Sequence, residues 1–203
     1  RAALINLAEE WRKLDGRRRT PDSQKHWDER AKSFSFKDTP DAYLQSFISK
    51  AGITGEESVL DMGCGTGSLA VALASMGCSV VAADFSTGML DRLHSKAAER
   101  GVLWEGGSSG LYSGDSSAGG AKISPSEIEA GKILPLRMSW EDDWANYGVE
   151  ENSVDVAVAS RSVITRDLED SLKKLSAVAC EKVCVTVGTG LSPRVDMRVA
   201  DRK

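Results

Sequence analysis

The chain has 203 residues, enough for one ordinary α/β domain and too few for two large ones. Its 41% hydrophobic and 28% charged residues are typical of a globular protein, and its net charge of −4 argues against a general nucleic-acid binder. No stretch reaches the roughly 18 consecutive apolar residues that indicate a membrane span, and no signal-peptide pattern is present.

The cysteines and histidines predict neither a metal site nor a disulfide framework. The four cysteines lie mostly inside apolar runs: Cys64, Cys78, Cys180 and Cys184. Neither their spacing nor that of the two histidines, His26 and His94, suggests zinc ligands. We therefore expect no metal and a reduced, cytoplasmic compartment. The chain begins at Arg1 without a methionine, as a fragment of a longer protein would.

The first part of the chain, residues 1–38, is predicted to form a helical cap. Apolar residues at helical spacing predict an amphipathic helix over 2–14, which a basic run then ends. The segment HWDERAKSFSF follows and mixes aromatic with charged residues. After it, Thr39 and Pro40 are typical of the start of a helix, and Gly52 is typical of its end.

Beyond residue 57, short apolar strands alternate with helices. Strands are predicted over 58–63, 78–84, 133–140, 154–160 and 182–188, and helices over 67–76, 86–100 and 167–179. This alternation predicts one α/β domain over 39–203, a doubly wound, mostly parallel sheet with helices on both faces.

A stretch rich in glycine and serine interrupts this pattern at about residues 105–126. It is longer than the ~12–15 residues at which loops without secondary structure become uncommon. A flexible surface insertion is the favoured interpretation, because the stretch lies near an edge of the predicted sheet. A lid over an active site is the alternative.

The sequence VLDMGCGTGSLA carries the strongest chemical signal. Gly63, Gly65 and Gly67 follow a predicted strand and open a helix, where unpaired backbone N–H groups and the helix dipole favour an anion or a nucleotide. Asp84 ends the next strand, at the distance where an acid binds ribose hydroxyls. NAD and S-adenosylmethionine both carry ribose, so Asp84 does not choose between them. The spacing G-x-G-x-G differs from the dinucleotide fingerprint G-x-G-x-x-G.

DMGCGTGSLA followed by VAADFSTGML resembles the first two motifs of class I S-adenosylmethionine-dependent methyltransferases. The resemblance implies a Rossmann-like fold, with Asp61 near the methionyl amino group of the cofactor. It also implies that the glycine turn accommodates the methionine portion and ribose. The residues that it assigns to the cofactor in this turn are Asp61, Gly63, Cys64, Gly65 and Gly67.

In the second motif, the resemblance implies that Asp84 binds both ribose hydroxyls, while Phe85 packs on the adenine with Met89 nearby. LPLRMSWEDDW resembles the third motif, which contacts the adenine through the positions matching Ser139, Trp140 and Glu141. This chain departs from the pattern, because Ser139 stands where aspartate is common. Glu141 or Asp142 could take over that contact.

VDVAVASRS resembles the fourth motif, which implies that Ser160 and Arg161 lie beside the reacting methyl group. The planar fork of Arg161 could pair with a carboxylate-bearing acceptor or with the acidic run that begins at Asp167. No catalytic base is indicated, since His94 is expected on a helix surface and His26 is expected to pack beside its neighbour. The HWDERAKSF segment looks like the W-D-x-x-A cap of this family.

The function expected from this resemblance is methyl transfer from S-adenosylmethionine to a small-molecule acceptor. The alternatives are an RNA or protein methyltransferase and a module that holds the cofactor without catalysis. Nucleic acid and membrane partners are not expected, while a homodimer stays open. The family's sheet continues after the strand over 182–188 with a helix and an antiparallel strand pair, for which this chain leaves no room. We therefore expect the C-terminal part of the sheet to be missing.

Overall fold

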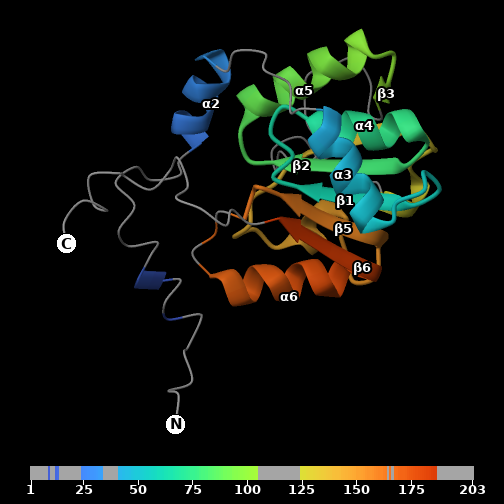
Figure 1. Ribbon diagram of the computed structural model, residues 1–203. Helices are drawn as coiled ribbons and strands as arrows, with labels where there is room; N and C mark the ends of the chain where they lie inside the picture. Colours follow the sequence, from blue (N-terminus) through green and yellow to red (C-terminus); the bar gives the residue numbers. More distant parts are fainter. Residues whose placement is uncertain are drawn as a thin grey trace.

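The computed structural model describes residues 24–33, 41–104, 124–163, 165 and 167–186, together with Glu9, Arg12 and Lys13 (Figure 1). Its helices are α2 (Gln24–Ser33), α3 (Asp41–Ala51), α4 (Ser68–Met76), α5 (Thr87–Glu99) and α6 (Leu168–Val178). Its strands are β1 (Ser58–Met62), β2 (Ser79–Asp84), β3 (Leu103–Trp104), β4 (Lys132–Arg137), β5 (Val154–Ser160) and β6 (Ala179–Thr186). Two short 3₁₀ turns are η1 (Pro125–Glu127) and η2 (Trp144–Tyr147).

The six strands form one open sheet in the order β3-β4-β2-β1-β5-β6. All the strand pairs in this sheet are parallel. The chain moves outward from β1 to one edge through β2, then returns to the other side of β1 through β5. Such a reversal leaves a crevice at the carboxyl ends of the central strands, where α/β proteins of this type bind ligands. The predicted parallel α/β sheet is confirmed.

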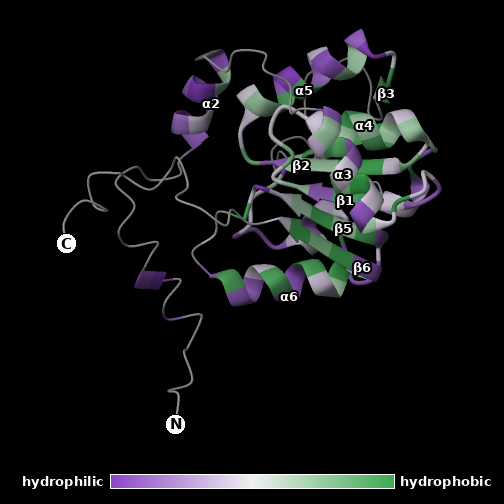
Figure 2. Ribbon diagram, viewed as in Figure 1, coloured by the Kyte–Doolittle hydropathy of each residue, from purple (hydrophilic) through white to green (hydrophobic). Residues whose placement is uncertain are grey.

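Alternate residues of the central strands pack on opposite faces of the sheet. Val59 and Val80 face a cluster that includes the apolar residues of α3, α4 and α5. Leu60 and Val81 face the other cluster, built from α6 and the segment 138–149. Figures 1 and 2 show α6 on the opposite side of the sheet from α4, with strands that are mostly hydrophobic. The predicted coverage of both faces follows from this alternation.

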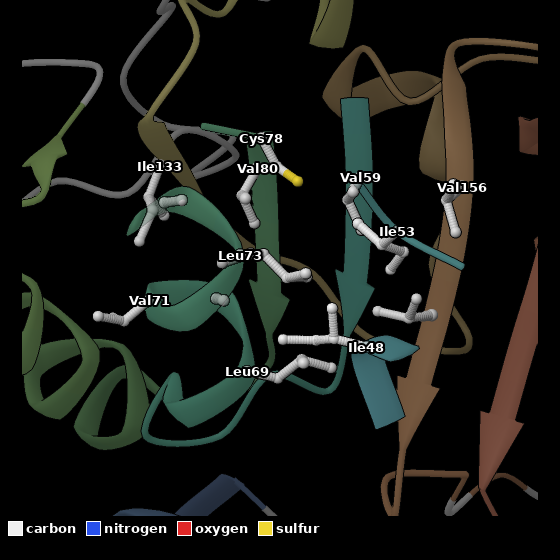
Figure 3. Packing of buried hydrophobic residues seen from close by; sticks show 14 of the residues in the cluster. Ile48, Ile53, Val59, Leu69, Val71, Leu73, Cys78, Val80, Ile133 and Val156 are labelled. Atoms are coloured by element: carbon white, nitrogen blue, oxygen red, sulfur yellow. The ribbon is translucent and has the colours of Figure 1, made fainter. Parts of the chain in front are cut away.

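Helix α4 is the centre of the first cluster. Figure 3 shows Leu69 and Leu73 pointing from α4 toward the strands that carry Val59 and Val80. Leu73 has no exposed surface, whereas Met76 at the end of the same helix is 44% exposed. The helix ends at Gly77, whose backbone is left-handed and donates to the carbonyls of the last turn, which closes the helix before β2 begins.

Most element boundaries differ from the sequence prediction by only one residue, and the larger differences involve three strands. The predicted strand over 133–140 ends at Arg137, because the Ser139 N–H bonds to the carboxylate of Asp142 rather than to a neighbouring strand. The last strand begins at Ala179, directly after α6. The short edge strand β3 was not predicted, since two residues cannot show an alternating pattern.

Part of the predicted cap and insertion lies outside the described residues. Of the predicted helix over 2–14, only Glu9, Arg12 and Lys13 are described; they are helical, and Lys13 pairs with Glu9 at 3.1 Å. Of the insertion predicted over 105–126, only 124–126 are described, and these residues begin η1. None of the helices that the structure describes combines the length and the apolar character needed to cross a bilayer.

We expect Leu73→Ala to lower the free energy of unfolding by about 2–5 kcal/mol, because it removes a fully buried side chain and leaves a cavity against the sheet. Met76→Ala is the matched control on the same helix and should change it by less than about 0.5 kcal/mol. Urea denaturation of both variants measures the difference. Equal losses would show that α4 does not pack as described.

Candidate functional site

The three glycines after β1 fall into two groups by what a side chain at each would meet. A Cβ atom on Gly63 would lie 2.5 Å from Cβ of Ser162, and one on Gly67 would lie 1.8 Å from Cδ1 of Leu93. A Cβ on Gly65 would meet no atom within 4 Å. All three have a positive φ, which a side chain disfavours. Gly63 and Gly67 are therefore explained by packing within the domain, and Gly65 is the glycine that faces open space.

Asp61 lies in β1 directly before this turn and is 2% exposed. Its Oδ2 atom has no hydrogen-bond partner among the described residues. A buried carboxylate oxygen without a partner is costly, since such a group loses its hydration and gains nothing in return. A feature of this kind marks a position where a ligand can supply the missing donor.

Asp84, at the end of β2, accepts hydrogen bonds from the segments that follow β1 and β2. Its Oδ2 accepts the Gly65 N–H at 2.9 Å, and its Oδ1 accepts the Ser86 N–H at 2.9 Å. The side chain is buried and held toward the glycine turn. Each carboxylate oxygen can accept a second hydrogen bond, so capacity for a ligand hydroxyl remains.

Asp61 and Asp84 are both buried at this edge, and burial acts on the pKa of each. Burial raises the pKa of Asp61 from 3.8 to about 7, and the charge of Asp84 adds to this shift. Burial also raises the pKa of Asp84 to about 6, against the lowering effect of the amides that donate to it. Burial of the Cys64 thiol raises its pKa well above the ordinary value, and the negative charges of Asp84 and Asp61 add to this shift. The site therefore favours a ligand that brings hydrogen-bond donors or positive charge.

Hydrogen bonds join the four segments that the sequence motifs identified. The Met138 N–H donates to the carbonyl of Asp84 at 3.2 Å, which holds the segment after β4 beside β2. The Trp140 indole N–H donates to the carbonyl of Ser162 at 3.1 Å. The Ser162 hydroxyl in turn donates to the carbonyl of Met62. The structure thus brings all four motifs together at the carboxyl ends of the central strands.

The residues of the third motif have mainly structural contacts. Trp140 is buried, and its ring centroid lies 5.8 Å from that of Trp144. The Asp142 carboxylate accepts from the Ser139 N–H at 2.8 Å and from the Tyr147 hydroxyl at 3.0 Å. Glu141 is exposed. The contact with adenine that the sequence left open between Glu141 and Asp142 stays a prediction.

Phe85 and Met89, the two apolar residues assigned to the second motif, differ in how deeply they are buried. Phe85 follows Asp84 and is half-buried, so part of this residue is accessible after the end of β2. Met89 lies in the first turn of α5 and is 3% exposed, while its N–H donates to the Ser86 hydroxyl that caps this helix. Met89 therefore belongs mainly to the core, and Phe85 is the more accessible of the two.

A polar cluster at the ends of β5 and β6 joins the predicted Ser160 and Arg161 to two residues that the sequence did not indicate, Tyr43 and Thr186. The Tyr43 hydroxyl, from α3, lies 2.7 Å from the hydroxyl of Ser160 and 3.0 Å from that of Thr186. The guanidinium of Arg161 lies over the Tyr43 ring, with Cζ 4.6 Å from the centroid. Arg161 has a φ of 59°, a conformation that costs a residue with a side chain about 1–2 kcal/mol. Tyr43 sits among apolar positions of its helix, so its sequence pattern did not distinguish it.

The two histidines contact aromatic rings. His26 makes an edge contact with Trp27 at 5.8 Å, as predicted, and His94 lies 4.9 Å from Trp104. Among the described residues, no group of three or more histidine, cysteine or acidic side chains could hold a metal ion.

Comparisons with known proteins agree with this geometry. Residues 59–108 match the family model of a methyltransferase domain. A Haemophilus influenzae protein of no described activity is 31% identical over 147 residues, which is 72% of this chain and 43% of that protein. Cypemycin N-terminal methyltransferase of Streptomyces is 42% identical over 64 residues, 32% of this chain and 26% of that enzyme. This chain therefore spans less than half the length of these two relatives.

The fold has a solved counterpart. A protein of Methanococcus maripaludis, provisionally assigned as an S-adenosyl-L-methionine-dependent methyltransferase, matches 87% of this chain and 68% of its own with a TM-score of 0.54. Sequence identity to that structure is 20%, so the likeness establishes the fold.

We expect Asp61→Asn to stabilise the free protein by about 1–3 kcal/mol at pH 8, because it removes a buried charge whose Oδ2 atom has no hydrogen-bond partner among the described residues. Folding raises the pKa of this acid, so the folded state binds the proton more tightly and stability should fall as pH rises from about 4 to about 7. The gain should therefore shrink at pH 5. Chemical denaturation at both pH values measures it, with the exposed Glu56→Gln as control. A loss of stability at pH 8 would contradict the absence of a partner for Oδ2 of Asp61.

Proposed function

We propose that this chain, which carries a class I methyltransferase domain, binds S-adenosyl-L-methionine and transfers its methyl group to a small-molecule acceptor. The observation that carries the proposal is Asp61, a buried carboxylate with an unpartnered oxygen at the point where the strand order reverses. A carboxylate in this state raises the free energy of the folded protein unless a ligand donates to it.

The residues around Asp61 fit the parts of this cofactor. The amino group of the methionine portion would donate to Oδ2 of Asp61, and the ribose hydroxyls would donate to Asp84, whose oxygens have capacity left. Gly65 offers backbone beside open space, so a ligand can touch the main chain there. Phe85, half-buried beside Asp84, would pack on the adenine.

The first helix after the turn supports the same placement. Gly67 is its N-cap and supplies no side-chain hydrogen bond to the first turn of α4. The positive end of this helix therefore faces the glycine turn without a capping side chain, which favours a partially negative ligand group. No pyrophosphate-type spacing accompanies the turn, which argues against a dinucleotide.

When bound, the cofactor supplies a methyl group made electrophilic by the adjoining sulfonium. This chain would bind and orient the cofactor through the glycine turn and its two acids, and would exclude water from the reacting atoms. Ser160 and Arg161 would line the acceptor side, because they lie at the carboxyl end of β5 and the next residue, Ser162, contacts the start of the glycine turn. A base is needed only where the acceptor must lose a proton.

A small molecule is the acceptor class that the chain supports best. The net charge of −4 offers no general attraction for nucleic acid. Arg161 presents a cation beside the cluster of Tyr43 and would suit an acceptor that carries a carboxylate. We place the reaction in the reducing cytoplasm, since all four cysteines are free thiols. A homodimer is compatible with this proposed function.

Calorimetry of the purified chain should show binding of S-adenosylmethionine and of its product S-adenosylhomocysteine at micromolar order, and no binding of NAD. The reason is that the glycine spacing differs from the dinucleotide fingerprint, while Asp61 and Asp84 could accept from an amino group and from ribose hydroxyls. Binding of NAD with no response to either adenosyl compound would overturn the proposed cofactor.

Turnover of radiolabelled cofactor against metabolite, protein and RNA panels then separates the alternatives. Label in a small molecule supports the proposed acceptor class, whereas label in RNA or protein replaces it. Binding without any transfer by the full-length protein would identify a module that holds the cofactor without catalysis.

Asp84→Asn should weaken S-adenosylhomocysteine binding about 10- to 100-fold, because it removes the charged acceptor of the ribose hydroxyls. Asp155→Asn is the matched control at the amino end of the sheet, where that carboxylate accepts from the Ser58 N–H at 2.8 Å. It should lower stability and leave affinity unchanged.

Gly65→Ala tests the same site by blocking it. The variant should lose most of its affinity for S-adenosylhomocysteine, while its stability falls by only roughly 1–2 kcal/mol from the positive φ, because its Cβ meets no atom of the protein. Calorimetry and thermal melting measure the two effects. Parental affinity in both Gly65→Ala and Asp84→Asn would show that the cofactor lies elsewhere.

A further inference from the structure

Helix α2 reaches the cofactor edge of the domain by packing on the start of α5. Ala31 of α2 is 2% exposed. A Cβ atom on Gly88, in the first turn of α5, would lie 3.1 Å from Cβ of Ala31 and 3.2 Å from Cα of Asp28. The aspartate and the alanine of the W-D-x-x-A segment are thus the two residues that meet Gly88, and the close approach needs a glycine there.

The carboxylate of Asp28 completes the cap of α5. Its Oδ1 accepts the Ser86 hydroxyl at 2.6 Å and the Gly88 N–H at 3.1 Å. Ser86 has no exposed surface, and its hydroxyl oxygen accepts the Met89 N–H at 3.2 Å. A side chain 58 residues away in sequence therefore orients the serine that starts this helix.

Ser86 connects Asp28 to the acid that we assign to the ribose. The Ser86 N–H donates to Oδ1 of Asp84, while the Ser86 hydroxyl donates to Asp28. The serine is thus fixed between the two carboxylates. If the Ser86 hydroxyl lost its bond to Asp28, Ser86 would be held less firmly, and so would its N–H, which orients the Asp84 carboxylate.

We propose that Asp28 is a positioning residue for cofactor binding, which acts through Ser86 to hold Asp84 in the orientation that receives the ribose hydroxyls. The proposal rests on the proposed function and adds α2 to the cofactor site. It makes docking of α2 and binding of the ribose mutually dependent, because the same serine serves both.

The test compares adenosine with 2′,3′-dideoxyadenosine, since only the first carries the hydroxyls that Asp84 would accept. We expect the parent protein to prefer adenosine about tenfold. Asp28→Ala should reduce this preference to less than about threefold, and Asp28→Asn should retain most of it, because an amide oxygen can still accept from Ser86. Glu29→Ala, an exposed acid on the same helix, should leave the preference unchanged.

A double-mutant cycle separates positioning from simple docking. In the Asp84→Asn background, Asp28→Ala should change the affinity for S-adenosylhomocysteine by less than about twofold, because the residue through which it acts is already altered. If Asp28→Ala does not fold, Ser86→Ala and Gly88→Ala interrupt the same connection and should give the same loss of preference.

Two outcomes would overturn the proposal. One is an unchanged adenosine preference in Asp28→Ala, and the other is an effect of Asp28→Ala that adds fully to that of Asp84→Asn. Failure of the proposed function gives a different result, because the parent protein would then bind neither adenosine nor S-adenosylhomocysteine.

Discussion

The two hydrogen bonds that the Asp84 carboxylate accepts hold the functional edge of this domain together. One comes from Gly65 after β1 and the other from Ser86 at the start of α5. Because β1 and β2 are neighbours, one side chain can join the turn that follows each of them. The segment after β4 joins at the same residue, through the bond from the Met138 N–H to the carbonyl of Asp84. Three segments of the site therefore meet at this one residue.

This edge has an electrostatic cost that the rest of the domain must offset. Two buried carboxylates share it, and one oxygen of Asp61 has no partner among the described residues. The sheet supplies the offset, since the central strands have both faces buried against the two clusters. Strain and unpaired charge of this kind gather where a ligand binds, because the ligand relieves them. The same logic applies to Arg161, whose backbone is left-handed beside Tyr43.

Much of the site could be predicted from the sequence. The strand that ends in Asp61, the turn with three glycines and the acid at the end of the next strand are local patterns, and neighbouring parallel strands necessarily present their carboxyl ends at one edge. The reason for each glycine was less accessible. Gly63 and Gly67 are required by Ser162 and Leu93, which come from other segments of the chain. No local pattern shows such contacts.

The sequence by itself determined the alternation of strands and helices, the glycine turn and the positions of Asp61 and Asp84, because hydrophobic period and turn residues act over a few residues. Only the tertiary structure decided which distant residues meet there. Tyr43 reaches Ser160 and Thr186 across the sheet edge, and Asp28 reaches Ser86 from a separate helix. These contacts depend on how α3 and α2 dock. Docking is set by the packing of whole elements, which the order of residues within one element does not reveal.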